Sequence, residues 1–134
     1  MYSDQMLKEI LLSTKTIASV GLSSNPEKVS YGVGAYLLKQ GYHVVPVNPT
    51  ADEILGEKAY PNLESVPEEI DVVQVFRRPE DVPPVVADAI KVGAKVLWMQ
   101  EGIVNEEAAQ AARDAGLQVV MDACMRATHM RLIG

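Results

Sequence analysis

Small and hydroxyl-bearing residues follow the first strongly apolar segment of the chain and could together hold a phosphate group. Gly21 ends that segment, where a side chain would block the close approach of a ligand. We expect Ser30 to cap the next helix and to leave the N–H groups of Tyr31, Gly32 and Val33 free. Hydroxyls and free N–H groups at a helix start bind phosphate. The residues predicted to form this anion site are Gly21, Leu22, Ser23, Ser24, Lys28, Ser30, Tyr31, Gly32 and Val33.

The standard nucleotide-binding motifs are absent from this segment. A strict G-x-G-x-x-G is missing because Gly32-Val33-Gly34 is followed by Ala35-Tyr36-Leu37, and there is no G-x-x-x-x-G-K-[ST]. An NAD site also needs an acidic residue near the end of the second strand. Here that strand ends in Val47-Asn48-Pro49, and no carboxylate comes before Asp52. NAD is therefore disfavoured, and the simplest alternative is a capped loop without a ligand.

Two arginines follow the third apolar segment. Arg77 and Arg78 are expected at the same edge of the sheet as the loop after the first strand. The planar guanidinium group suits a phosphate. The alternative is a solvated turn in which each arginine forms an ion pair with Glu80 or Asp81.

Short apolar segments alternate with amphipathic stretches, which is typical of βαβ units and a parallel sheet. Strands are predicted over 16–22, 42–48, 71–76, 94–100 and 117–122, helices over 4–13, 31–40, 82–92 and 106–115, a long loop over 49–70, and a short tail after 122. The fold class is thus α/β: one Rossmann-like three-layer domain over 1–134, with a five-stranded parallel sheet in the order 3-2-1-4-5. Ligands of such folds lie beyond the carboxyl ends of the strands, here at a switch point between strands 1 and 4.

Composition narrows the function classes. The 134 residues are 48% hydrophobic and 22% charged, with a net charge of −6. An acidic surface disfavours binding to nucleic acid or to anionic membranes. One cysteine cannot form an internal disulfide, the N-terminus lacks the apolar core of a signal peptide, and no apolar run is long enough to span a bilayer. We therefore expect a cytoplasmic protein.

Several segments, taken together and in this order, carry a resemblance to a known family. They are IASVGLSSNPEKVSYGVGAYLLKQGYHVVPVNP, ILGEKAYPNLESVP, DVVQVFRRPEDVPPVV, GAKVLWMQEGIVNEEAA and VVMDAC. Over about residues 10–132 the chain resembles the small bacterial and archaeal CoA-binding proteins of the YccU-like family. That family is similar to the N-terminal CoA-binding domain of the succinyl-CoA synthetase α subunit.

The resemblance implies a Rossmann-like fold that binds coenzyme A or an acyl-CoA. It places the phosphates at the loop after the first strand. The remaining contacts that it implies are Asn48, Pro49 and Thr50 at the adenosine, Val75, Phe76 and Arg77 along the adenine and pantetheine path, and Gln100, Glu101 and Gly102 near the thiol. Relatives commonly carry a lysine at the position of Thr50, so this chain has one charge fewer at the nucleotide end.

The remaining reactive side chains do not form a catalytic or metal-binding group. Cys124 is either an inert half-buried thiol or a partner for the CoA thiol in a mixed disulfide. His43 and His129 are expected to be structural, because no acid–base partner accompanies them and the spacing is not that of zinc ligands. No catalytic residue and no metal site are predicted.

The predicted function is a stand-alone CoA-binding domain without its own catalytic machinery. One alternative is an NAD-linked redox protein. Another is a subunit of a CoA ligase, which would need a partner chain because the synthetase relatives use a further ligase domain with a phosphorylated histidine. A third is an interaction domain without a ligand, and the identity of any protein partner stays open.

Overall fold

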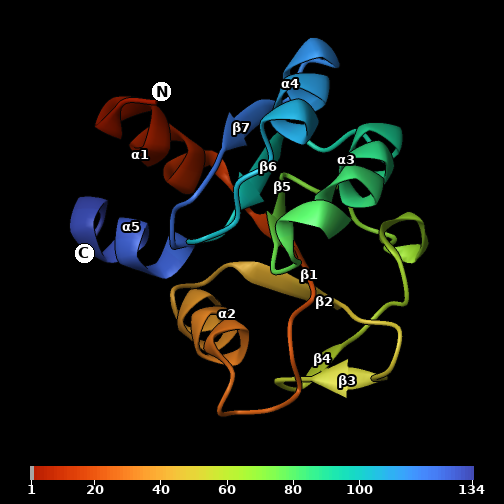
Figure 1. Cartoon of the computed structure of the whole chain (residues 1–134). Coiled ribbons are helices and arrows are strands. Elements are labelled where there is room, and N and C mark those ends of the chain that lie inside the picture. Colours follow the sequence, from red (N-terminus) through yellow and green to blue (C-terminus); the bar gives the residue numbers. More distant parts are fainter. Residues whose placement is uncertain (1) are drawn as a thin grey trace.

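Five parallel strands form the central sheet, and helices cover both of its faces (Figure 1). The structure is a computed structural model and describes residues 2–134. The strands are β1 (Thr16–Val20), β2 (His43–Val47), β5 (Val72–Val75), β6 (Val96–Met99) and β7 (Gln118–Val120). Most of their residues are buried, as in parallel sheets that are covered on both sides. The three-layer α/β fold predicted from the sequence is therefore confirmed.

The predicted strand order is wrong in one respect. The order is β2-β1-β5-β6-β7, which is 2-1-3-4-5 for the five strands of this sheet, and not 3-2-1-4-5. Val20 of β1 lies opposite Val47 of β2 on one side and Val75 of β5 on the other. The third strand is thus a direct neighbour of the first. The switch point lies between β1 and β5, and not between the first and fourth strands.

The connection between β2 and β5 explains the change in direction. It contains no α-helix, and its elements are β3 (Glu53–Ile54), β4 (Glu57–Lys58) and the 3-10 helix η1 (Leu63–Ser65). Leu63 packs into the core on the face opposite to the helix that joins β1 to β2. The chain therefore crosses to the other face and returns on the far side of β1. The sequence predicted this segment only as a long loop.

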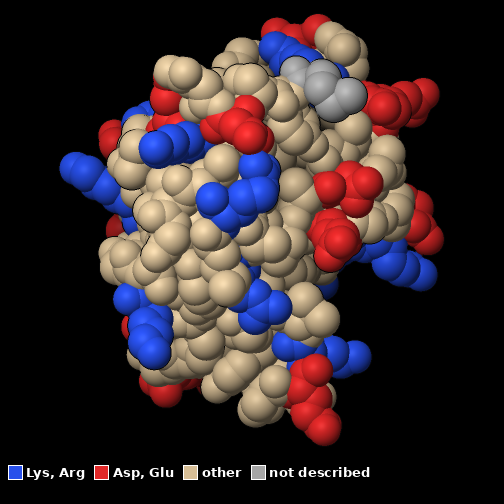
Figure 2. Space-filling view, turned by 90° about the vertical axis from the view of Figure 1, so that its left-hand side faces the viewer, with Lys and Arg blue, Asp and Glu red and all other residues tan. Residues whose placement is uncertain are grey.

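Each face of the sheet has its own core. Helices α3 (Val82–Lys91) and α4 (Glu106–Asp114) cover one face, together with η1. Helices α1 (Asp4–Ser13), α2 (Val29–Lys39) and α5 (Met125–Leu132) cover the other. Figure 2 views the side that carries α1, α2 and α5, where basic side chains lie among uncharged ones and acidic side chains lie mainly toward the margins. The negative net charge is therefore unevenly spread.

The core under α1, α2 and α5 includes the last part of the chain. Trp98 is fully buried there, and its indole N–H donates to the carbonyl oxygen of Ala123 at 2.8 Å. The residues after 122 form α5, where the sequence predicted a tail. None of the helices described over residues 2–134 has the length and apolar character that crossing a bilayer requires.

Asp71 joins the amino ends of three strands. Its carboxylate accepts the N–H groups of Lys15 and Thr16 at 2.9 and 3.0 Å, and it lies 3.3 Å from the ammonium group of Lys95. Burial alone would raise the pKa of Asp71, but these hydrogen bonds and the nearby Lys95 hold the pKa below its ordinary value. The ionised carboxylate therefore stabilises the end of the sheet opposite to the predicted ligand edge.

Candidate functional site

Gly21 and Phe76 meet where β1 and β5 end. Gly21 has a φ of +90°, and a Cβ atom at this position would overlap the carbonyl oxygen of Phe76. The N–H of Gly21 donates to the carbonyl oxygen of Val47 at 3.1 Å, so the residue also ties β1 to β2. The need for glycine thus has a reason within the protein, whereas the sequence suggested only the approach of a ligand.

Helix α2 begins two residues earlier than predicted. Lys28 is at the N-cap and makes no side-chain capping bond. Ser30 is buried in the first turn, and its Oγ accepts the N–H of Ser23 at 3.0 Å. The prediction that Ser30 caps the helix is therefore wrong. Its hydroxyl instead holds the loop after β1 against the start of α2, a role that spacing alone does not distinguish from capping.

The free N–H groups at the start of α2 differ from those predicted. The N–H groups of Tyr31 and Gly32 both donate to the carbonyl oxygen of Lys28, at 3.1 and 3.5 Å. Val33 is buried inside the helix. Among the described residues, the N–H groups of Val29 and Ser30 have no partner. The start of α2 thus still offers two N–H donors to an anion, but they lie about half a helical turn before the N–H groups that the sequence predicted.

The loop between β1 and α2 is held by its own side chains. Ser23 Oγ accepts the N–H of Asn25, and Asn25 Oδ1 accepts the N–H of Glu27, each at 3.0 Å. Ser24 is exposed at the tip, whereas the side chain of Leu22 is fully buried in the core. Ser24 is therefore accessible to a ligand, while Leu22 can offer only its backbone.

An open cavity of about 530 Å³ lies over this corner of the sheet. Its wall combines the start of α2 with the turn after β5. The lining residues are Gly21, Ser23, Lys28, Val29, Ser30, Phe76, Arg77, Arg78, Pro79 and Ile103. Three of these are basic and none is acidic, although the chain has a net charge of −6. The cavity is therefore suited to an anionic group.

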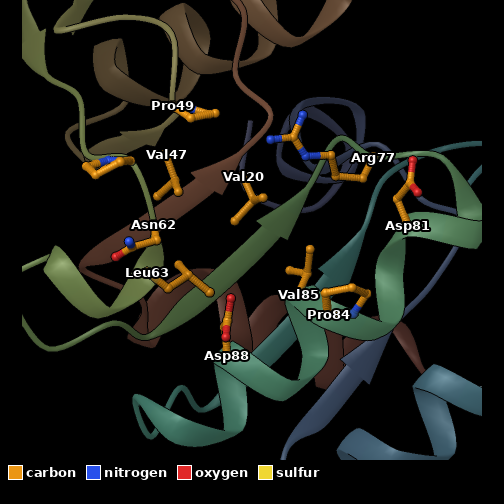
Figure 3. A pocket seen from close by; sticks show the side chains of 11 residues that line it. Val20, Val47, Pro49, Asn62, Leu63, Arg77, Asp81, Pro84, Val85 and Asp88 are labelled. Carbon is orange, nitrogen blue, oxygen red and sulfur yellow. The ribbon is translucent and has the colours of Figure 1, made fainter.

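A second cavity of about 380 Å³ lies beyond β1 and β2 (Figure 3). Seven of its eleven lining residues are apolar, and Asp81 and Asp88 are the two acidic ones. The lining residues are Val20, Val47, Pro49, Pro61, Asn62, Leu63, Arg77, Asp81, Pro84, Val85 and Asp88. Figure 3 shows the Arg77 side chain extending across the opening toward Pro49. Arg77 lines both cavities and thereby connects them.

The two arginines after β5 have different environments. Arg78 is 74% exposed, and its Nε lies 3.0 Å from Asp81 Oδ2. The hydrogen bond to Asp81 and the nearby charge of Glu80 raise the pKa of Arg78. Arg77 is half-buried and makes no ion pair or side-chain hydrogen bond with any residue in 2–134. The ion-pair alternative therefore describes Arg78, and Arg77 keeps its donors for another group.

Asn48 braces the loop after β2. Its Nδ2 donates to the carbonyl oxygen of Leu22 at 3.1 Å, and its Oδ1 accepts both the N–H and the hydroxyl of Thr50 at 2.8 Å. These bonds occupy the amide group of Asn48. Pro49, between these two residues, lines the second cavity, and Thr50 is exposed beside it.

A chain of buried polar side chains lies beneath the edge of the sheet. Ser19 Oγ donates to Gln74 Oε1 at 2.8 Å, and Gln74 Nε2 donates to Gln100 Oε1 at 3.2 Å. Gln100 Oε1 also accepts the N–H of Met125 at 3.0 Å. The predicted site residue Gln100 therefore fixes the start of α5 to the sheet, and Val75 is fully buried in the opposite core.

The loops after β6 and β7 are tied together. The N–H of Gly102 donates to Asp122 Oδ1 at 2.6 Å, and Glu101 is exposed beside it. Cys124 is a free, half-buried cysteine at the N-cap of α5. The predicted thiol-end residues are thus brought next to Cys124. The sequence offered no signal for Asp122, because its partner is a backbone group.

The two histidines lie outside these cavities. His129 is buried, its Nδ1 is 2.8 Å from the hydroxyl of Tyr36, and its ring is edge-on to Tyr36 and Tyr42. Burial lowers the pKa of His129 below its ordinary value. His43 lies on β2, within 3.8 Å of Glu57 and 3.6 Å of Glu68. Within residues 2–134, no group of three or more His, Cys, Asp or Glu is placed to hold a metal ion.

Sequence reasoning missed most of the second cavity. Pro61, Asn62 and Leu63 come from the segment that was predicted only as a loop. Pro84 and Val85 come from the first turns of α3. The sequence did contain one indication of this part of the site, the turn residues Pro61-Asn62. They lie in the loop that joins β2 to β5, and loops that connect strands often line binding sites.

Comparisons with known proteins agree with this geometry. Residues 15–130 match a family model described as a CoA binding domain. The uncharacterized protein YneT of Bacillus subtilis is 45% identical over 92% of this chain and 91% of its own length. The solved structure of a hypothetical protein from Pyrococcus horikoshii has a TM-score of 0.97 and 44% identity, covering 99% of this chain and 94% of its own. Acetate–CoA ligase (ADP-forming) II of Archaeoglobus fulgidus is 30% identical over 76% of this chain, which spans 16% of that ligase.

Proposed function

The chain belongs to the CoA binding domain family, and we propose that it binds coenzyme A or an acyl-CoA along the carboxyl edge of the sheet as a stand-alone binding domain. The ligand would extend from the second cavity, across the end of β1, toward the loops after β6 and β7. Coenzyme A supplies a thiol that carries acyl groups. The residues of this chain would bind and orient it.

The pyrophosphate would lie in the cavity over Gly21. The unpaired N–H groups of Val29 and Ser30 offer hydrogen bonds, and Lys28 and Arg77 offer positive charge. Charged donors and a helix start act together on a phosphate, and each charge-assisted hydrogen bond contributes about 1.5–3 kcal/mol. An acidic protein can hold an anion here because no carboxylate lines this cavity.

The adenosine end would occupy the second cavity. Val47, Pro49 and Leu63 provide apolar surface for a purine ring. Asp88 provides a carboxylate that can accept a hydrogen bond from the amino group of adenine. Pockets of this type combine an apolar lining with a few polar groups that fix orientation.

The observation that carries the proposal is the position of Arg77. Its side chain lines both cavities, and it has no acidic partner in the described residues. A half-buried guanidinium group that is left unpaired favours an anionic ligand at that point. A pyrophosphate between an adenosine and a pantetheine would place its charge there.

Isothermal titration calorimetry tests the proposal with four ligands at moderate salt. Coenzyme A is expected to bind far more tightly than NAD, and free pantetheine more weakly than either coenzyme A or dephospho-CoA. Binding of NAD without binding of coenzyme A would favour the redox alternative. Absence of binding for all four ligands would favour the interaction domain.

A ligase subunit is a second candidate, supported by the similarity to acetate–CoA ligase. Because the chain spans 16% of that ligase, ligase activity would need further domains that residues 1–134 do not supply, and a partner chain is one source of them. An affinity-tagged chain would then co-purify with a protein that restores acetate- and CoA-dependent conversion of ATP to ADP. Loss of that activity on removal of the tagged chain is the expected result, and retention of it would reject this candidate.

A further inference from the structure

Helices α2 and α5 lie side by side, with their first turns together. In the first turn of α5, Arg126 approaches Gly32 of α2. One turn further along both helices, His129 Nδ1 lies 2.8 Å from the hydroxyl oxygen of Tyr36. Residues three or four positions apart share one face of a helix, so the two pairs show that α2 and α5 run in the same direction. The start of α5 therefore lies next to the start of α2, which lines the cavity of about 530 Å³.

The guanidinium group of Arg126 occupies space that a side chain at position 32 would take. An ideal Cβ atom on Gly32 would lie 3.1 Å from Arg126 Nη1, which is closer than most Cβ contacts in proteins. The Cβ atoms of a helix are tilted toward its N-terminus. The guanidinium group therefore lies beside the first turn of α2, where the N–H groups of Val29 and Ser30 have no partner among residues 2–134.

Arg126 has no negatively charged partner in the part of the chain that the structure describes. The residue is half-buried and makes no ion pair or side-chain hydrogen bond with residues 2–134, whereas Arg131 on the same helix pairs with Asp4 at 3.0 Å. No fully buried side-chain nitrogen lacks a partner, so the guanidinium nitrogens of Arg126 are accessible from outside. The positive end of α2 repels a cation, and an anion that lies between the two would be attracted by both.

We propose that Arg126 binds the pyrophosphate of coenzyme A, which it reaches from the side of α5 while Arg77 reaches it from the side of β5. The inference rests on the proposed function of CoA binding. A pyrophosphate has two charged phosphate groups, and a guanidinium group on each side pairs with both. The N–H groups of Val29 and Ser30 donate to the phosphate oxygens between the two arginines. Gly32 contributes by leaving the space in which Arg126 lies.

Titration calorimetry of wild type, Arg126→Gln and Arg131→Gln tests this with coenzyme A and dephospho-CoA, which share the pyrophosphate but differ in the 3′-phosphate. Arg126→Gln is expected to weaken the binding of both ligands by the same factor, about tenfold or more, because each loses a charge-assisted hydrogen bond. Arg131→Gln is the matched control on the same helix, because Arg131 is exposed and already paired, and its affinities should equal those of wild type.

Three results of this titration would overturn the assignment. Wild-type affinity in Arg126→Gln would show that Arg126 does not touch the ligand. Equal losses in the two arginine variants would be explained by the lower positive charge of the protein alone. A loss that is confined to coenzyme A would place Arg126 at the 3′-phosphate and not at the pyrophosphate.

Gly32→Ala tests the same contact without removing the arginine. Alanine favours a helix more than glycine does, and Nη1 is the flexible end of its side chain, so the thermal midpoint should be equal or higher. The affinity for coenzyme A should nevertheless fall, though less than in Arg126→Gln, because the new Cβ atom displaces the guanidinium group. In the Arg126→Gln background, Gly32→Ala should leave the affinity unchanged.

An equal loss of affinity on Gly32→Ala in both backgrounds would show that the methyl group acts on the ligand directly, and unchanged affinity in the wild-type background would reject the contact. If Arg126 only packed α5 against α2, affinity would follow thermal stability in every variant, which would also reject the proposal. Thermal melts check that each variant folds, and Gly32→Ala against wild type decides if Arg126→Gln does not fold.

The wild-type titration separates this inference from the proposed function. If the wild-type chain binds neither coenzyme A nor dephospho-CoA, the proposed function itself fails. If the wild-type chain binds both and Arg126→Gln binds them equally well, only the role of Arg126 is rejected and the binding function stands.

Discussion

Gly21 and Phe76 set how closely the ends of β1 and β5 approach each other. Only a residue without a Cβ atom avoids the carbonyl oxygen of Phe76, and the backbone of Gly21 has a φ of +90° that L side chains rarely adopt. Because β1 and β5 flank the switch point, this pair of residues also determines the shape of the candidate phosphate cavity.

Gly21→Ala is expected to lower the free energy of unfolding by more than strain alone explains. Gly41 is the matched control, because its φ is +98° and a Cβ atom there would meet nothing within 4 Å. Gly41→Ala should lower the free energy of unfolding by about 1–2 kcal/mol, because alanine is strained in the left-handed conformation. Gly21→Ala should cost more, since backbone atoms must also move. Urea unfolding of both variants measures the difference, and equal losses would contradict the overlap with Phe76.

Arg77→Ala is expected to weaken the binding of coenzyme A by about 1–3 kcal/mol, typical of a hydrogen bond to a charged group. Arg78→Ala should cost less, because the guanidinium group of Arg78 is exposed and already paired with Asp81. Titration calorimetry on the two variants gives the comparison. An unchanged affinity in Arg77→Ala would remove Arg77 from the site.

Thr50→Lys is expected to strengthen the binding of coenzyme A by roughly 0.2–1 kcal/mol, the usual range for an exposed charge pair. The gain should be larger for coenzyme A than for dephospho-CoA and should shrink as salt is added. Thr50→Met is the control, since it also removes the hydroxyl bond to Asn48 but adds no charge. Equal affinities for the two variants would place Thr50 away from the nucleotide.

Asp71→Asn is expected to destabilise the fold at pH 7 by about 1–3 kcal/mol, the usual effect for hydrogen bonds to a charged group. The pKa of Asp71 is lowered in the folded state, so its contribution is full above the unfolded pKa of about 3.9 and is lost as the pH falls through the lower folded value. The difference in the free energy of unfolding between wild type and Asp71→Asn should therefore become smaller as the pH is lowered.

Urea unfolding of wild type and Asp71→Asn between pH 7 and pH 2.5 measures this difference in the free energy of unfolding. Glu53→Gln serves as the control, because Glu53 is exposed and makes no side-chain hydrogen bond or ion pair within residues 2–134. A gap for Asp71→Asn that stays constant over the whole range would show that the carboxylate charge contributes nothing to stability.

The sequence predicted the elements of the sheet better than their arrangement. Periodicity found all five strands, and α1 has the predicted bounds of Asp4–Ser13. The predicted strand order was wrong because Val72–Val75 is buried throughout. A strand buried on both faces does not alternate between polar and apolar residues, so its sequence does not indicate which strands it pairs with. Helix α5 was missed because Met125–Leu132 lacks a side-chain cap and its exposed Met130 interrupts the apolar pattern.

The candidate site was predicted in position but not in detail. The loop after β1 and Arg77 lie together at one cavity, as the rule for carboxyl ends of parallel strands predicts. The role of Ser30 was mistaken, since a serine in the first turn and a serine at the N-cap have the same local sequence. The second cavity depends on a connection without a helix, and its path over the sheet is set by tertiary packing.

The crevice at the switch point exists because the connection that leaves β1 passes through α2 on one face of the sheet, whereas the connection that leaves β5 passes through α3 on the other face. Such an opening is built into the path of the chain and needs no hinge or moving lid to receive a molecule. Chemical selectivity can then be altered through the residues that border it, while the architecture that creates it stays intact. The preference of this scaffold for one cofactor over another is accordingly a matter of a few short loops.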